Sequence, residues 1–182
     1  MDDGDGMDHA DAEFAAFVRR RGDHHLRTAV LLTGDWHAAE DLVQTCLVKL
    51  YRAWPRLDTA VDPDAYLRRV LVNTHRSWWR ARWRRELPVA ALPDHAGTGG
   101  GEEQYAVAQT VRRALAALPV RQRTALVLRY FEDLPETQVA ELMGCSVGSV
   151  KTHSHRGLRA LRKLLPHIEV VNETPGHRSE VQ

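Results

Sequence analysis

The amino-acid sequence predicts an all-α protein of two small helical domains joined by a flexible linker, with a helix-turn-helix in the C-terminal domain. Apolar residues recur at helical spacing over most of the 182 residues, and alternating strand patterns are nearly absent. The periodicity fails between residues 87 and 104, where Pro88, Pro93 and the run Gly97-Thr98-Gly99-Gly100-Gly101 are typical of a linker. The segment after this linker carries the turn and cap residues of a helix-turn-helix.

The predicted organisation has five parts. They are a disordered acidic N-terminus (1–10), a three-helix domain (11–86), the linker (87–104), a four-helix domain (105–165) and a polar tail (166–182). The expected helices cover 11–32, 36–54, 63–86, 105–117, 120–131, 135–143 and 147–164. Gly34 suits the left-handed position that ends the first helix, and Asp35 can cap the second. Asp62 and Pro63 form a typical start for the third helix, as N-cap and first helical residue.

The net charge of +1 hides a strong asymmetry. Residues 2–13 hold six acidic residues and no Lys or Arg, whereas residues 66–85 hold seven arginines and no acid. Residues 149–163 hold five Lys or Arg, again without an acid. This distribution favours a nucleic-acid binder, and the plainer alternative is two solvated basic faces.

Other classes of protein find little support in the sequence. Cys46 and Cys145 lie among apolar neighbours and are expected to be reduced thiols, and no CxxC pair accompanies the scattered histidines. We therefore expect no metal and no cofactor. The acidic N-terminus is no signal peptide, and no window approaches eighteen apolar residues, so we expect a cytoplasmic protein without a membrane span. No nucleophile elbow or phosphate loop is present, so we expect no catalytic residues and no enzyme.

The helix-turn-helix prediction rests on residues 134–164. Small Ala140 permits a close helix crossing, Gly144 suits the tight turn, and Ser146 is a natural N-cap for the second helix. On that helix an apolar stripe faces the core; its members are Val150, Ser154, Leu158 and Leu161. Gly157 is expected to ease helix packing.

The outward face of the same helix is polar and basic, as a recognition helix requires. Ser149, Thr152 and His153 are the candidates for contacts with base edges. Lys151, Arg156 and Arg159 are the candidates for contacts with phosphates. An ordinary helical hairpin with a solvated basic face is the alternative.

Two faces in the N-terminal domain carry further candidates. In the second helix, Glu40, Asp41 and Gln44 lie opposite the apolar stripe, beside Leu47 and Val48. In the third helix, a polar-basic face is formed by Asn73, Arg76, Arg80 and Arg84. Its buried stripe is expected to be Leu67, Val70, Leu71, Thr74 and Trp78, while Trp79 and Trp83 can either contact DNA or pack on the first helix. Arginines and aromatic planes suit phosphates and exposed bases.

Residues 118–134 and the helix-turn-helix resemble the domain of bacterial sigma factors that reads the promoter −35 element. Pro135 departs from the family's Ser or Thr, and His153 departs from its Arg or Gln. The segment Ala39-Glu-Asp-Leu-Val-Gln is similar to the family's segment that docks on the clamp helices of the largest subunit of RNA polymerase. The third helix and the connection 56–62 resemble the element that reads and melts the −10 region and captures a flipped base, with Ser77 where many relatives have Asp.

The resemblance covers residues 11–165 and lacks the additional domains of housekeeping sigma factors, so it is closest to the compact extracytoplasmic-function (ECF) type. The Leu-Leu-Thr-Gly-Asp and Ser-Trp-Trp-Arg segments resemble an actinobacterial subgroup. The resemblance implies core RNA polymerase and promoter DNA as partners, and it admits an anti-sigma factor. It assigns polymerase binding to Glu40, Asp41, Gln44, Leu47 and Val48. It assigns −10 DNA binding to Asn73, Arg76, Trp79, Arg80 and Arg84, and −35 DNA binding to Ser149, Lys151, Thr152, His153, Arg156 and Arg159.

Two rival hypotheses remain at this point. A stand-alone helix-turn-helix regulator would share the C-terminal features but would leave the Glu40–Gln44 face and the arginine-tryptophan helix without a purpose. A small helical enzyme would use the histidines or acids, although His24-His25 and His153-Ser-His155 are more simply surface residues.

Overall fold

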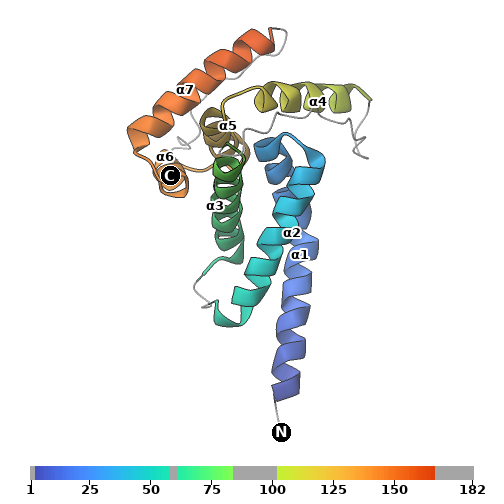
Figure 1. Cartoon of the computed structure of the whole chain (residues 1–182). Helices are drawn as coiled ribbons and strands as arrows, with labels where there is room; N and C mark the ends of the chain where they lie inside the picture. Colours follow the sequence, from blue (N-terminus) through green and yellow to red (C-terminus); the bar gives the residue numbers. More distant parts are fainter. Residues whose placement is uncertain (1–2, 58–60, 84–101, 167–182) are drawn as a thin grey trace, which may run out of the picture. The chain divides into compact units, whose positions relative to one another are not determined.

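The computed structural model describes residues 3–57, 61–83 and 102–166, and these residues form helices and their connections without a strand. They fall into two compact units (Figure 1). The first unit contains the chain up to Val30 and from Asp35 through the third helix, and the second contains the helices from residue 102 on together with Leu31–Gly34. The all-helical, two-domain prediction is therefore confirmed.

The first unit is built from α1 (Asp3–Thr33), α2 (Trp36–Ala53), the short 3₁₀ helix η1 (Trp54–Arg56) and α3 (Pro63–Trp83). The helix start predicted at Asp11 is wrong, because α1 begins eight residues earlier and includes most of the segment 1–10 expected to be disordered. Acidic residues are favourable near the start of a helix because they complement its dipole, and this segment is acidic. The expected end of the third helix, residues 84–86, lies outside the described residues.

The turn and caps predicted around α1, α2 and α3 are confirmed. Gly34 adopts φ +78°, and the Asp35 side chain accepts a hydrogen bond from the Ala38 N–H at 2.7 Å. At the start of α3, Asp62 accepts from the N–H groups of Asp64 (3.0 Å) and Ala65 (3.3 Å), with Pro63 as the first helical residue. These contacts satisfy backbone donors that a helix start leaves without intrahelical partners.

The core of the first unit is formed by α1, which buries Phe17 and Ala29, and by the contact between α2 and α3. The α2 stripe is buried as predicted at Ala39, Leu42, Val43, Cys46 and Leu50, and α3 buries Leu67, Leu71, Val72, Thr74 and His75. Across this contact the Lys49 ammonium donates to the Thr74 hydroxyl at 2.9 Å. Burial raises the pKa of the Cys46 thiol, so the thiol stays protonated and packs as a small apolar group.

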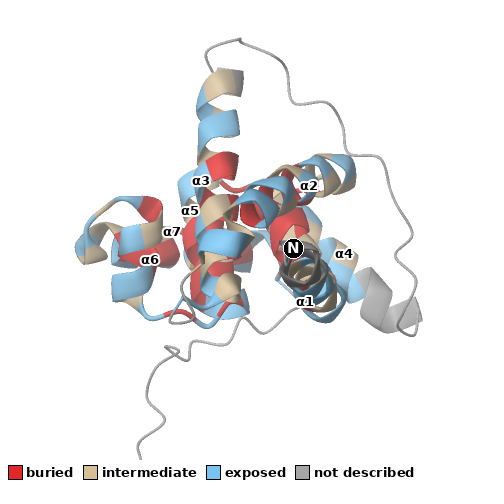
Figure 2. Ribbon diagram, turned by 90° about the horizontal axis from the view of Figure 1, so that it is seen from below, coloured by how far each residue is buried: buried red, intermediate tan, exposed pale blue. Residues whose placement is uncertain are grey.

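The prediction that Trp78 belongs to the core is wrong. Its side chain is 37% exposed, whereas Leu67 and Leu71, on the same helical stripe, are fully buried. In Figure 2 the last turns of α3 project beyond the buried residues, shown in red, and carry exposed and half-buried ones. A helical stripe is buried only where another element covers it, and sequence periodicity does not say how far that cover extends.

The second unit contains α4 (Glu102–Ala116), α5 (Val120–Leu126), the π-helical turn η2 (Val127–Phe131), α6 (Glu136–Met143) and α7 (Val147–Leu164). The limits of α7 are those predicted, and η2 replaces the last part of the helix expected over 120–131. Ala114, Leu115, Leu118, Leu126, Leu161 and Leu165 form one buried cluster. The structure thus packs α7 against α4 and α5 through leucines.

The turn between α6 and α7 has the predicted geometry. Gly144 is left-handed (φ +60°), and the Cys145 N–H donates to the Ala140 carbonyl at 3.0 Å. A Cβ at Gly157 would lie only 2.8 Å from Leu126 Cδ1, so the missing side chain lets α7 approach α5 closely. This contact supports the packing role predicted for Gly157.

Candidate functional site

The outward face of α2 carries an acidic and partly apolar surface. Asp41 and Gln44 are exposed, Leu47 is half-buried, and the Val48 side chain is 51% exposed. Glu40 is half-buried and held in place, because the Trp36 indole N–H donates to its Oε1 at 2.9 Å and His37 Nδ1 lies 3.7 Å from its Oε2. All five predicted residues therefore lie away from the buried stripe, and Asp41, Gln44 and Val48 are the exposed ones.

Tyr51 extends this face and was missed by the sequence reasoning. Its side chain is 47% exposed and lies three residues after Val48, and its hydroxyl donates to Asp11 Oδ1 at 2.9 Å. The hydrogen bond to Asp11 and that carboxylate's charge raise the pKa of Tyr51. The helical spacing from Gln44 through Val48 was the signal that could have found it.

A charged cluster fixes the start of α3 against α1. Arg21 donates two hydrogen bonds of 2.7 Å to the Asp64 carboxylate, and the fully buried His25 donates to the same group at 2.8 Å. Arg68 adds a contact of 3.2 Å from within α3. Burial would raise the pKa of Asp64, but the hydrogen bonds from Arg21 and His25 outweigh it and lower this pKa to about 2. The α1–Asp64 contacts position the basic helix that follows.

The polar face of α3 carries the predicted DNA-binding residues that the structure describes. Asn73 and Arg80 are exposed, and Arg76 and Trp79 are half-buried. The Arg76 guanidinium donates to Asn73 Oδ1 at 3.3 Å, so these two side chains are oriented together. Arg84 lies outside the described residues.

The six candidates on α7 lie away from the core, four of them exposed and Ser149 and His153 half-buried. Ser146 caps the helix, because its hydroxyl accepts the Ser149 N–H at 3.2 Å, and the Thr152 hydroxyl donates to the Gly148 carbonyl at 2.9 Å. Val150, Ser154 and Leu161 are buried behind them, while Leu158 is half-buried. The N-terminal turns of α7 therefore present short polar side chains on a braced helix.

Burial and neighbouring charges shift the pKa of one residue on the outward face of α7, His153. Burial lowers the pKa of His153, and the charges of Arg121 and Arg156 lower it further. The imidazole is therefore neutral at pH 7 and can both donate and accept a hydrogen bond at a base edge. Arg121, at the start of α5, was not among the predicted residues, and it brings another cation to the side of His153.

An ionic bridge between η2, α6 and α7 was also missed by the sequence reasoning. Glu136, the first residue of α6, has Oε2 3.6 Å from the Lys151 ammonium and Oε1 3.8 Å from the buried Arg129 guanidinium. Arg129 also donates to the Leu134 carbonyl at 3.3 Å. Lys151 is therefore held by a carboxylate that a DNA phosphate would have to replace or share.

Among the described residues, no cluster of three or more His, Cys, Asp or Glu side chains could hold a metal ion. In that same part of the chain, no helix has the length and apolar character needed to cross a membrane.

Comparison with known proteins identifies the family of this chain. Residues 17–85 match the family described as Sigma-70 region 2, and residues 108–161 match Sigma-70, region 4. The RNA polymerase sigma-E factor of Streptomyces avermitilis is 41% identical over 153 residues, covering 84% of this chain and 85% of the relative. The chain belongs to the ECF sigma factors. Its two described units thus correspond to regions 2 and 4, which in this family serve promoter recognition.

More distant relatives agree with this assignment. The ECF RNA polymerase sigma factor SigW of Bacillus subtilis is 26% identical over 169 residues, covering 84% of this chain and 88% of SigW. The solved structure of the sigma factor RpoE from Bartonella quintana, in complex with the anti-sigma factor NepR, matches with a TM-score of 0.71 and 24% identity. The match covers 85% of this chain and 98% of that one. The structure of CnrH with the cytosolic domain of CnrY matches with a TM-score of 0.58 and 23% identity, covering 84% and 87%. These two structures support the fold.

Proposed function

We propose that this ECF sigma factor uses three surfaces in transcription initiation, one for core RNA polymerase and two for promoter DNA. The α2 face (Glu40, Asp41, Gln44, Leu47 and Val48) binds the clamp helices of the largest subunit of core RNA polymerase. The polar face of α3 (Asn73, Arg76, Trp79 and Arg80, with Arg84 beyond the described residues) binds and opens the −10 region. The outward face of α7 binds the −35 element.

The observation that supports this division best is the chemistry of α7. Short polar side chains occupy its capped N-terminal turns, and Lys151, Arg156 and Arg159 are exposed on the same side of the helix. Such a helix enters a major groove, reads base edges with its first turns and contacts phosphates with its cations. Ser149, Thr152 and His153 are the residues that we assign to base edges.

The α2 face has the opposite chemistry. It presents carboxylates beside the exposed apolar Val48, so it suits a partner surface that combines basic and apolar side chains. Without such a partner the face would have no role, which is why a stand-alone operator-binding regulator explains less of the molecule.

The remaining parts of the proposal concern strand opening and control. The connection Leu57–Pro63, whose residues 58–60 lie outside the described residues, takes part in capturing a flipped −10 base, and contacts to that base offset an unstacking cost of a few kcal/mol. RpoE and CnrH are each solved with a regulatory partner, and we propose that an anti-sigma factor likewise controls this chain. The protein acts in the cytoplasm, and bond formation is left to the polymerase, so the chain is not an enzyme.

Transcription reconstituted from core polymerase and a pool of genomic promoters tests the proposed function. We expect the chain to direct initiation at a subset of these promoters, with a footprint over both the −10 and −35 elements. A footprint that forms without polymerase and is unchanged when polymerase is added would support the stand-alone regulator instead.

A further inference from the structure

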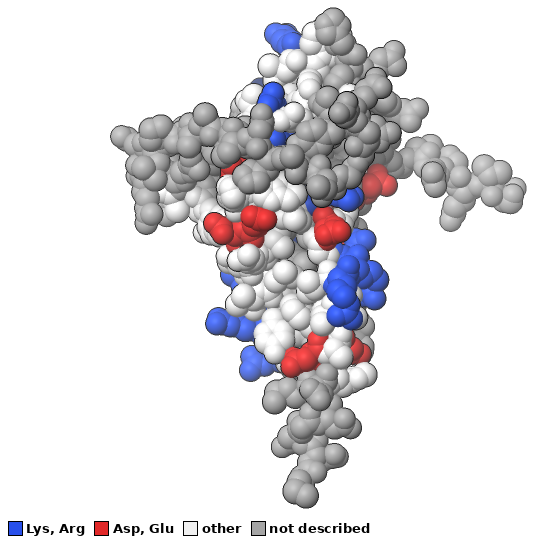
Figure 3. Space-filling view, turned by 90° about the vertical axis from the view of Figure 1, so that its right-hand side faces the viewer, with Lys and Arg blue, Asp and Glu red and all other residues white. Residues whose placement is uncertain are grey.

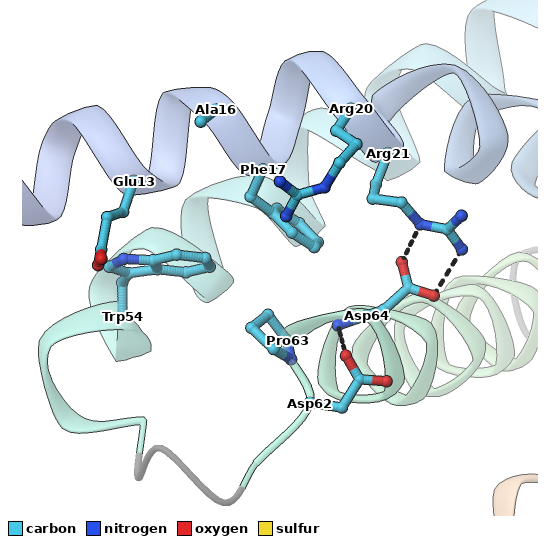
Figure 4. Close-up of a pocket in the computed structure, with 9 residues that line it drawn as sticks. All are labelled: Glu13, Ala16, Phe17, Arg20, Arg21, Trp54, Asp62, Pro63 and Asp64. Carbon is cyan, nitrogen blue, oxygen red and sulfur yellow. Dashed lines mark hydrogen bonds and ion pairs between the residues drawn. The ribbon is translucent and has the colours of Figure 1, made fainter.

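A cavity of about 620 Å³ opens in the first unit on the side of α1. Its lining comes from α1 (Glu13, Ala16, Phe17, Arg20 and Arg21), from Trp54 in η1, and from Asp62, Pro63 and Asp64 at the start of α3 (Figure 4). This volume lies within the range of sites that hold a small ligand or a group of side chains. Asp62 and Pro63 belong to the connection Leu57–Pro63 proposed above to capture a −10 base, and none of the other residues assigned above lines the cavity.

The cavity combines an apolar wall with one available cation. Phe17 and Trp54 form the wall, with ring centroids 5.5 Å apart. In Figure 4, Arg20 reaches from α1 toward the cavity beside Phe17, and it makes no hydrogen bond or ion pair with the residues that the structure describes. Its neighbour Arg21 is committed to Asp64 by two hydrogen bonds. Arg20 is therefore free to bind an anionic group beside the aromatic wall.

The carboxylates of the lining are mostly engaged. Asp64 is held by Arg21 and His25, and Asp62 caps α3. Glu13 has His9 at 3.3 Å and is exposed at the rim. Three carboxylates against two arginines would repel a polyanionic strand, whereas a single carboxylate can reach Arg20. The face of the molecule that includes α1 likewise alternates basic and acidic side chains (Figure 3), which suits a protein partner better than DNA.

The apolar wall continues out of the cavity over the surface. Phe14 packs edge-on against Trp54 and against Tyr51, with centroid distances of 5.3 and 5.1 Å, and Tyr51 is largely exposed. Such an aromatic surface with a polar rim is typical of a protein-binding site. The cavity attracts a carboxylate through Arg20, whereas the α2 face repels one, so the two surfaces select different partner segments.

We propose that this cavity binds an acidic segment of a partner protein, which places an aromatic or branched apolar side chain on the Phe17–Trp54 wall and a carboxylate on Arg20. The segment would combine an apolar anchor with one neighbouring carboxylate, and the anchor supplies most of the binding. Arg20 then selects acidic over neutral segments.

Titration of the isotope-labelled full chain with defined probes, followed by the NMR signal of the Trp54 indole N–H, tests the proposal. The probes are N-acetyl-tryptophan, its uncharged amide, an acetylated and amidated Gly-Gly-Trp-Glu-Gly peptide and its Gln counterpart. We expect saturable shifts, each charged probe binding about fivefold more tightly than its neutral counterpart, and the peptide binding more tightly than free N-acetyl-tryptophan. Arg20→Gln should abolish the preference for charge, whereas Arg19→Gln, an exposed neighbour that does not line the cavity, should leave it intact.

Four results would overturn the proposal. Three of them are the absence of saturable shifts at Trp54, equal binding of charged and neutral probes, and stronger shifts from a thymidine dinucleotide, which would assign the cavity to single-stranded DNA. Binding of free N-acetyl-tryptophan without binding of the peptide would also contradict it, because the occupant would then be a small molecule. The titration needs neither polymerase nor promoter, so its failure is separate from a failure of the proposed function.

Discussion

The helices α3 and α7 are both basic, and they are held in different ways. Along α7 the buried positions run from Val150 to Leu161, so the helix is braced over most of its length by the rest of the second unit. Along α3 the buried positions end at His75, and Trp78 is exposed. A braced helix keeps its side chains in fixed register with base edges of duplex DNA. The less supported end of α3 suits separated strands, whose shape is not fixed in advance.

The largest expected effect comes from removing the cations of α7. Lys151→Ala with Arg156→Ala should weaken binding to a −35 duplex on the order of 10- to 100-fold. The slope of log affinity against log salt concentration should fall by the amount expected for the loss of about two phosphate contacts. Lys163→Ala, an exposed cation in the last turn, is the matched control. Transcription from a cognate promoter that stays unchanged in the double variant would refute the assignment of α7 as the recognition helix.

Removing the Asp64 carboxylate, which holds the start of α3 against α1, should destabilise the first unit. Asp64→Asn leaves Arg21, His25 and Arg68 without their shared carboxylate and should cost about 2 kcal/mol, a value reduced from that of a fully buried pair because the site is partly exposed. Urea unfolding measures this loss, with the exposed Asp23→Asn as control. A loss no larger than that of the control would mean that α3 is positioned by its apolar contacts alone.

The same carboxylate predicts how stability depends on pH. The pKa of Asp64 is lowered from 3.8 to about 2 in the folded chain, so its contribution is present above pH 4 and disappears as the pH falls through 2. The wild-type urea midpoint should therefore fall more steeply than that of Asp64→Asn between pH 4.5 and 2. Parallel curves would contradict the role of this ion-paired carboxylate.

A side chain at Gly157 should weaken the packing of α7 against α5. Gly157→Val would place side-chain atoms against Leu126 and should cost about 1–2 kcal/mol in thermal unfolding. Gly148→Val, where a Cβ would meet only the Ser146 hydroxyl at 3.9 Å, controls for placing valine in the same helix. Equal losses at the two glycines would show that the α5–α7 contact tolerates a side chain.

The smallest expected effect concerns Glu136. Its carboxylate competes with DNA for Lys151, so Glu136→Gln should raise affinity for duplex DNA a few-fold and steepen its salt dependence. Glu141→Gln, an exposed acid on the same helix, should change neither. A fall in affinity would instead mean that Glu136 orients the Lys151 side chain toward the phosphate.

Sequence signals that act over a few residues predicted much of this structure. Contacts between residues far apart in the sequence could not be predicted from them. Asp35, Ser146 and Gly144 act within a few residues of their own positions, so the sequence predicted their caps and turns. The Arg21–Asp64 contact joins residues 43 apart, and Glu136 meets Lys151 only because α6 packs on α7. The prediction that Trp78 is buried failed for the same reason, because the exposure of its side chain depends on where the covering elements end.

Binding to core RNA polymerase tests the account most directly. Purified chain titrated into core enzyme lacking a sigma subunit should form a saturable complex, and Asp41→Lys with Gln44→Ala should weaken it at least tenfold. Asp23→Lys, which reverses an exposed acid outside the α2 face, should leave the affinity unchanged. If the wild-type chain shows no affinity for the core enzyme, the α2 assignment is wrong and the account loses its central claim.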